Sequence, residues 1–171
     1  MITNFAHLKG YPDLYDKALF AEDMLVNGTS KEHYLQAMAA MRRVIELMAR
    51  EMTEAAGLTD KKILFYAEAK PGEVSVTLFS RIKALYEFGT ITKQSADHLH
   101  EIRRKGNVAV LGVDEMIEKS RDEVFREAEQ MCKLLHEETC LFVHQYASAK
   151  KNGKLKRIMT SVVALFGGMW I

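Results

Sequence analysis

The scarcity of proline and the spacing of apolar residues constrain the fold of this chain more than any other feature of its sequence. Only two prolines, Pro12 and Pro71, occur among 171 residues. The apolar residues fall three or four positions apart, which is the period of one face of an α-helix and not of a strand. The sequence therefore predicts an all-α fold. A chain of this length is close to the usual size of one domain.

Five helices are expected from the apolar spacing together with residues that begin and end helices. The predicted starts are Pro12, Thr29 with Glu32, Ser75, Thr92, and Ser120 with Glu123, and the predicted stops include Gly28, Gly57 and Gly89. Two of the starts, Thr29 with Glu32 and Ser120 with Glu123, have the spacing of a capping box. Residues 62–72 contain a β-favouring apolar run closed by a Pro-Gly turn, so a short strand or loop is expected there. These elements predict one bundle-like helical domain over residues 1–149, followed by a tail over residues 150–171.

The second predicted helix carries a wide apolar stripe that is rich in methionine. Its members are Leu35, Met38, Met41, Val44, Ile45, Met48 and Met52. A stripe of this width is typical of a helix buried on more than one side. Because methionine fills irregular gaps, we interpret these residues as core and not as a cofactor site.

The two cysteines do not predict a disulfide or a metal site. Cys132 and Cys140 lie in one predicted helix, where a rise of about 1.5 Å per residue holds them roughly 12 Å apart, too far for a disulfide. His136 and Cys140 are spaced i, i+4, but they supply two of the three or four ligands that a zinc ion needs. No metal and no cofactor is therefore predicted. With no secretory leader, the cysteines fit a reducing cytoplasm.

The stretch EIRRKGNVAVLG, residues 101–112, is the part of the chain that most resembles a functional site. Arg103, Arg104 and Lys105 are cations of the kind favoured near a helix C-terminus. Gly106 and Asn107 both tolerate left-handed backbone, which predicts a capping turn at these two positions. Sequence motifs for phosphate-loop nucleotide binding are absent from the chain.

Residues 78–110, LFSRIKALYEFGTITKQSADHLHEIRRKGNVAV, resemble a bacterial and archaeal helical family of unknown function related to the HEPN superfamily. The family pattern ends in L-H-x-I-R-x-x-G-N-x-A-x-H, and the segments NFAHLKGYPDLYDKALFAEDML and MRRVIELMA are similar to its first half. Members occur alone and near the N-terminus of the motor subunit of type I restriction enzymes. The resemblance extends to Tyr146 and implies a HEPN-like fold, with a role in phage defence or mobile elements.

One departure from this pattern bears on catalysis. In HEPN ribonucleases an arginine, a nearby polar residue and a histidine form the active site, usually completed by the same motif from a second protomer. Arg103 and Asn107 match the first two, but Leu111 stands where the histidine is expected. Leucine cannot exchange a proton near neutral pH, whereas histidine can. His100, on the side of Arg103 and Arg104, is the alternative proton-transfer group, and Arg103, Arg104, Lys105 and Asn107 are predicted to form a binding surface.

The tail is basic and then apolar. Its basic residues are Lys150, Lys151, Lys154, Lys156 and Arg157, and they precede the apolar run IMTSVVALFGGMWI. As a helix, this run would reach about 21 Å, short of the roughly 30 Å of a bilayer core. Three interpretations stay open. The tail packs on the bundle or on a second protomer, it contacts anionic membrane peripherally, or it is the cut end of a longer protein.

These features predict a cytoplasmic, non-catalytic interaction or regulatory module that forms a homodimer or binds a partner protein, with membrane association through the C-terminus left open. The alternative from another class is a metal-independent HEPN-type endoribonuclease acting on RNA. The formal net charge of +1 favours no nucleic-acid partner globally, and no aromatic residue interleaves the basic run of the tail to stack bases.

Overall fold

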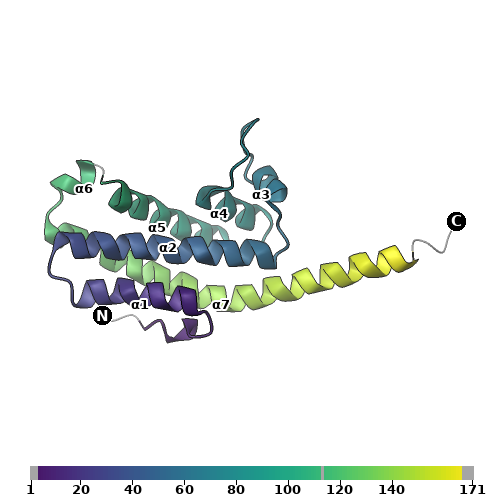
Figure 1. The fold of residues 1–171 in the computed structure, drawn as a ribbon, viewed down its shortest axis with the longest axis horizontal. Coiled ribbons are helices and arrows are strands. Elements are labelled where there is room, and N and C mark those ends of the chain that lie inside the picture. The colour runs from purple at the N-terminus through teal and green to yellow at the C-terminus, as the bar shows by residue number, and fades with distance from the viewer. Residues whose placement is uncertain (1–3, 113, 167–171) are drawn as a thin grey trace.

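The computed structural model describes the backbone of residues 4–112 and 114–166, and the side chains of residues 4–112, 116–147 and 150–151. All of the regular structure in these residues is helical (Figure 1). A 3-10 turn, η1 (Ala6–Leu8), precedes α1 (Pro12–Val26), α2 (Lys31–Ala55), α3 (Asp60–Tyr66), α4 (Leu78–Glu87), α5 (Lys93–Leu111), α6 (Asp114–Glu118) and α7 (Arg121–Phe166). The prediction of an all-α fold is confirmed.

The predicted number of helices was too low because two short helices were missed. The expected helices correspond to α1, α2, α4, α5 and α7, and the bounds of α1 match the prediction. The expected strand or loop at residues 62–72 is instead the end of α3 followed by a loop, and the described residues contain no strand. Ile63 and Ala67 are buried while Phe65 between them is 77% exposed. This is the i, i+4 pattern of a helix, because in a strand all three would share a face.

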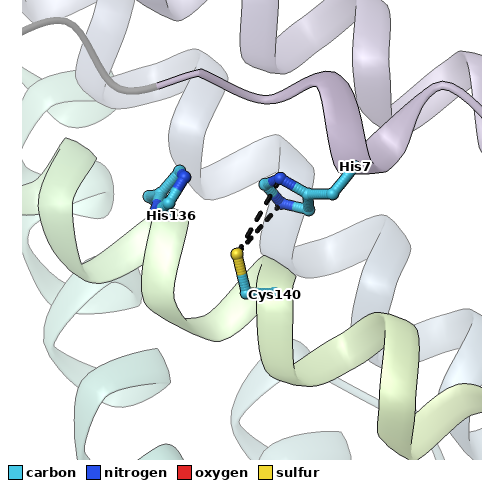
Figure 2. Close-up of side chains that lie close together, drawn as sticks. All are labelled: His7, His136 and Cys140. Carbon is cyan, nitrogen blue, oxygen red and sulfur yellow. Dashed lines mark hydrogen bonds between the residues drawn. The ribbon is translucent and has the colours of Figure 1, made fainter.

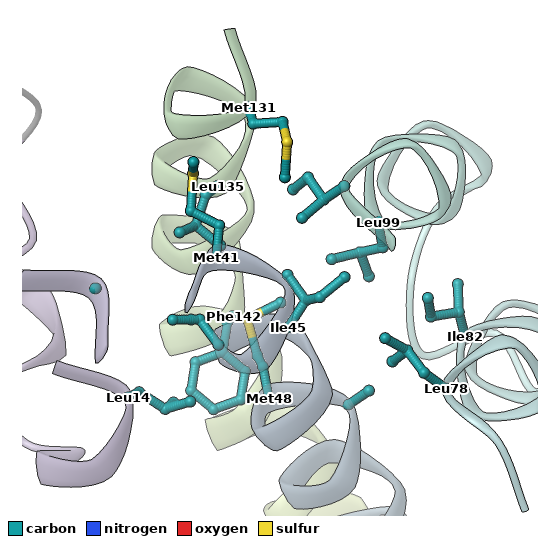
Figure 3. Packing of buried hydrophobic residues seen from close by; sticks show 14 of the residues in the cluster. Leu14, Met41, Ile45, Met48, Leu78, Ile82, Leu99, Met131, Leu135 and Phe142 are labelled. Atoms are coloured by element: carbon teal, nitrogen blue, oxygen red, sulfur yellow. The ribbon is translucent and has the colours of Figure 1, made fainter. Parts of the chain in front are cut away.

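Helix α2 lies at the centre of the bundle and packs against α1, α4, α5 and α7. Its methionines Met38, Met41, Met48 and Met52 are all buried, which confirms their interpretation as core. Figure 3 shows Met41, Ile45 and Met48 meeting side chains from α1, α4, α5 and α7. The apolar side chains labelled there are Leu14, Leu78, Ile82, Leu99, Met131, Leu135 and Phe142, and all are buried.

Several helix starts follow the predicted capping chemistry, and two, those of α2 and α4, are shifted. Helix α4 begins at Leu78 with Thr77 as its cap and not at Ser75. The Ser120 hydroxyl accepts from the Glu123 backbone N–H while the Glu123 carboxylate accepts from the Ser120 N–H, as predicted. Thr92 caps α5 by accepting from the Ser95 N–H. The box at α2 is formed by Ser30 and His33 and not by Thr29 and Glu32. The helix begins one residue later than predicted, so the His33 ring nitrogen takes the place of the glutamate carboxylate.

Helix α7 packs in the bundle along its first half and then projects away from it (Figure 1). Phe142 is fully buried, and Tyr146 is the last of the described side chains of α7 that packs against the core. Beyond it, the Lys150 ammonium lies 5.5 Å from the centre of the Tyr146 ring. The backbone of α7 passes from residues 1–149 into residues 150–166 without a break.

Candidate functional site

The stretch from Glu101 to Leu111 is helical throughout, which corrects the predicted capping turn at Gly106 and Asn107. Helix α5 ends at Leu111, and Gly112 with φ 60° and ψ 36° is its left-handed C-cap. Gly106 is buried in the helix. The two positions looked like a cap because glycine and asparagine also favour helix ends. Their actual role comes from a contact with α2, which is remote in sequence.

Gly106 and Asn107 are where α5 approaches α2. A Cβ atom at position 106 would lie 2.5 Å from the Cβ of Arg42 and 3.1 Å from its Cγ, so only glycine fits without movement. Next to it, the Arg42 Nε–H donates to the Asn107 Oδ1, with 2.5 Å between the heavy atoms. Arg42 also pairs with Glu46 at 3.5 Å, as predicted from their i, i+4 spacing. The Asn107 carbonyl is therefore engaged in holding two helices together.

Arg103 lies half-buried between α5 and α4. Its guanidinium carbon lies 5.5 Å from the centre of the Phe79 ring, a cation–π distance. Its Nε is buried and has no hydrogen-bond partner among the residues that the structure describes. Burial, together with the neighbouring charges of Arg104 and Arg42, lowers the pKa of Arg103 from its ordinary value. Arg103 thus combines a charge, an aromatic support and an unused buried donor.

His100 shares this environment. Its ring lies 5.1 Å from that of Phe79, centre to centre, and its Nδ1 is buried with no hydrogen-bond partner in the described part of the chain. Burial lowers the pKa of His100, the nearby Arg103 and Arg104 lower it further, and Asp97 partly opposes them. The ring is therefore held toward its neutral form. The other histidine of this helix, His98, is bound by its Nδ1 to the buried carboxylate of Glu138 on α7 at 2.7 Å.

The four residues of the predicted binding surface have different surroundings. Arg103 and Asn107 lie on the same side of α5, where Asn107 is bound to Arg42. Arg104 is exposed. Lys105 pairs with Glu101 at 3.0 Å, one turn back along α5. The structure thus brings Arg103 together with His100 and Phe79, and it directs Lys105 away to a surface ion pair.

An apolar patch occupies the end of α5. Leu111 is 74% exposed, Val110 is 58% exposed, and Ile117 on α6 is 68% exposed. We call these three side chains the α5-end patch. Exposed apolar side chains that form a contiguous patch mark contact surfaces, and these three come from two consecutive helices. The position where the HEPN pattern has a histidine therefore belongs to a surface suited to apolar contact.

A second cluster was not foreseen from the sequence. His7 from η1 lies beside His136 and Cys140 of α7, and one ligand atom from each falls within 4.8 Å of the others. The sequence analysis identified only His136 and Cys140, because their i, i+4 spacing is local. His7 is 133 residues from Cys140, so the contact between them forms only because the N-terminal segment packs against α7.

The tail lies largely outside the described side chains. Lys150 and Lys151 are exposed on α7, whereas Lys154, Lys156 and Arg157 lie outside the described side chains. Within the part of the chain that was searched, no helix combines the length and the apolar character needed to cross a bilayer.

Comparison with known proteins adds no relative. No family model, no curated protein and no solved structure matches this chain.

Proposed function

We propose that the protein is a non-catalytic, self-associating helical module in which the α5-end patch contacts a second copy. The observation that carries this proposal is the 74% exposure of Leu111 beside the exposed side chains of Val110 and Ile117. Burying one leucine side chain contributes about 1.5–3 kcal/mol, and a two-fold contact counts it twice.

A second copy is favoured as the occupant for two reasons. In the HEPN ribonucleases, to which the family that the sequence resembles is related, the corresponding motif is usually completed by a second protomer. The formal net charge of the chain is +1, so two copies repel each other only weakly. The same resemblance supports a role in phage defence or a mobile-element setting.

The site geometry favours binding over catalysis. Leu111 has no group that transfers protons, and the carbonyl of Asn107 is engaged by Arg42. The unpartnered nitrogens of Arg103 and His100 are buried, so a ribose phosphate does not reach these two atoms without movement of the surrounding side chains.

A metal-independent endoribonuclease is the second candidate, and one observation favours it. His100 and Arg103 lie together, each with a buried nitrogen that has no partner. The lowered pKa of His100 provides a neutral imidazole near pH 7, which is the form a general base needs. In this mechanism Arg103 binds the scissile phosphate.

Sedimentation equilibrium of the full chain over a range of concentrations tests the proposal. We expect a dimer whose dissociation constant rises at least about 100-fold in Leu111→Asp, because a charge replaces a doubly counted apolar contact. Val74→Asp is the control, since Val74 is 86% exposed in the loop between α3 and α4.

Two results would overturn the proposal. One is a chain that stays monomeric at every concentration, or a dimer that Leu111→Asp does not weaken. The other is RNA cleavage by the purified protein in EDTA that His100→Ala abolishes, which would establish the endoribonuclease in its place.

A further inference from the structure

His7, His136 and Cys140 lie together at the junction of the N-terminal segment and α7. Figure 2 shows the Cys140 sulfur directed at the His7 ring, with His136 beside both. The Cys140 Sγ lies 3.8 Å from the His7 Nδ1 and 3.7 Å from its Nε2. The two imidazole rings are 5.2 Å apart, centre to centre, and nearly perpendicular. All three side chains are partly buried.

Two hydrogen-bonding groups, the Thr139 hydroxyl and the Asn4 backbone, lie beside the His7 ring. The Thr139 hydroxyl donates its only proton to the His136 carbonyl oxygen at 3.0 Å. The same hydroxyl lies 2.8 Å from the His7 Nε2. The Cys140 sulfur is nearly equidistant from the two ring nitrogens of His7, so either nitrogen can supply the ligand atom.

One hydrogen bond shows which ring nitrogen of neutral His136 carries the proton. Its Nε2 lies 3.1 Å from the backbone carbonyl oxygen of Asn4, which can only accept. Hence Nε2 of His136 donates, and its other ring nitrogen keeps the lone pair. Ligand histidines in metal sites characteristically donate their second ring N–H to an oxygen, and His136 does so through its Nε2.

The donor set and its spacing fit a divalent ion of borderline softness. Zinc binds sulfur at about 2.3 Å and imidazole nitrogen at about 2.0–2.1 Å, which in a tetrahedral site places the two ligand atoms roughly 3.5 Å apart. The 3.8 Å between the Cys140 Sγ and the His7 Nδ1 is close to this separation. Two imidazoles and one thiolate are three protein ligands, the number found where a fourth position is open to water.

Burial acts in opposite directions on the two kinds of ligand: it favours the neutral imidazole that a metal binds, and it disfavours the thiolate, so Cys140 must lose its proton when a metal binds. Burial lowers the pKa of His7, as does the neighbouring His136, while a backbone hydrogen bond with Asn4 partly opposes the shift. Burial raises the pKa of the Cys140 thiol. On α1, Glu22 interacts electrostatically with His136. In the absence of metal the cluster therefore holds a neutral histidine and a protonated thiol.

We propose that His7, His136 and Cys140 bind one divalent transition-metal ion, with zinc as the best match. On binding, the metal–sulfur bond forms as the Cys140 S–H proton is released to solvent, and the histidines coordinate through their unprotonated nitrogens. The metal joins residues 133 positions apart and so clamps the segment around Phe5 and Leu8 onto α7. None of these residues belongs to α5, so this site is independent of the proposed dimer contact.

Metal titration of the full chain tests the site. The protein is prepared without a histidine tag, stripped with a chelator, and titrated with Co²⁺ alone and Zn²⁺ alone. We expect one Co²⁺ per chain with a thiolate-to-cobalt charge-transfer absorption, and displacement of Co²⁺ by Zn²⁺. One proton should be released for each metal bound near pH 7, and Zn²⁺ should raise the melting temperature.

Matched variants separate the ligands from their surroundings. Cys140→Ser keeps the volume but should abolish the charge-transfer absorption, whereas Cys132→Ala should retain it. His7→Ala and His136→Ala should each weaken binding by more than the roughly 10- to 100-fold expected for loss of a supporting partner. Thr139→Val should show that smaller loss, and Thr139→Ser, which keeps the hydroxyl, should restore the affinity.

Three results would overturn the proposal. They are the absence of charge-transfer absorption in the wild-type chain, unchanged affinity in both Cys140→Ser and His7→Ala, and equal losses in Cys132→Ala and Cys140→Ser. Far-ultraviolet circular dichroism confirms that each variant is folded, so a loss of binding is assigned to the missing ligand.

Discussion

Gly106 has no side chain, and this allows α5 to approach α2 closely. Alanine in a helix interior is ordinarily about 1 kcal/mol more favourable than glycine. Here the added Cβ would lie 2.5 Å from the Cβ of Arg42, which is tied to its own backbone and cannot move aside. We therefore expect Gly106→Ala to destabilise the protein by about 1–3 kcal/mol, the usual penalty of overpacking. Urea unfolding followed by circular dichroism measures the change.

Gly10→Ala is the matched control for that experiment. A Cβ at position 10 meets nothing within 4 Å, so this change should leave the free energy of unfolding nearly unaltered. If Gly106→Ala instead stabilised the protein, as helix propensity alone predicts, the close approach of α2 and α5 would be contradicted.

The residues that sequence analysis misassigned are those whose role depends on remote contacts. Gly106 and Asn107 have the same local signature in a helix cap and in a close helix crossing, and Arg42, which distinguishes the two, is 65 residues away from Asn107. His7 likewise gains its neighbours only through folding. Leu111 was recognised as a non-catalytic residue from the sequence, because side-chain chemistry needs no structural context.

At the scale of elements, local signals predicted most of the fold. Helix α1 begins and ends as expected because Pro12 and Asn27-Gly28 act within one turn. The short helices α3 and α6 were missed, since five to seven residues offer too few apolar positions to define a period. The extent of α7 beyond residue 149 was also missed, because Lys and Asn around Gly153 resemble a linker.

The exposed lysines where α7 leaves the bundle carry a testable prediction about membranes. A basic side chain near an anionic membrane surface contributes about 1 kcal/mol. If the tail contacts membrane, replacing Lys150 and Lys151 together by glutamine should weaken binding to phosphatidylserine vesicles by roughly 10- to 30-fold. Flotation or co-sedimentation with vesicles measures the binding, and Lys61→Gln with Lys62→Gln, both exposed on α3, is the control.

Deletion of residues 158–171 distinguishes the remaining interpretations of the tail. Loss of vesicle binding with an intact dimer supports membrane contact. A truncated chain that is insoluble or monomeric assigns the tail to the bundle or to the dimer interface, and contradicts the membrane prediction.

For the whole molecule, burial of histidines makes stability depend on pH near neutrality. The pKa of His100 is lowered by burial and by the charges of Arg103 and Arg104, and Asp97 partly opposes this shift. The pKa of His7 is lowered by burial and by the neighbouring His136. A histidine whose pKa is lower in the folded state binds fewer protons there than in the unfolded chain, so stability rises with pH. This contribution is fully present above the unfolded value of about 6.5 and is lost as pH falls through the folded values.

Urea unfolding at pH 7.5, 6.5 and 5.5 should therefore show a free energy of unfolding that decreases with each step toward acid. Glu22 acts in the opposite sense, because burial raises its pKa above the ordinary value of 4.5. Its contribution to stability is fully present below pH 4.5 and is lost as pH rises through its pKa in the folded state. His100→Gln removes one titrating group while keeping a polar side chain, so it should reduce the slope between pH 7.5 and 5.5. A slope that His100→Gln leaves unchanged would contradict the assignment to the buried ring beside Phe79 and Arg103.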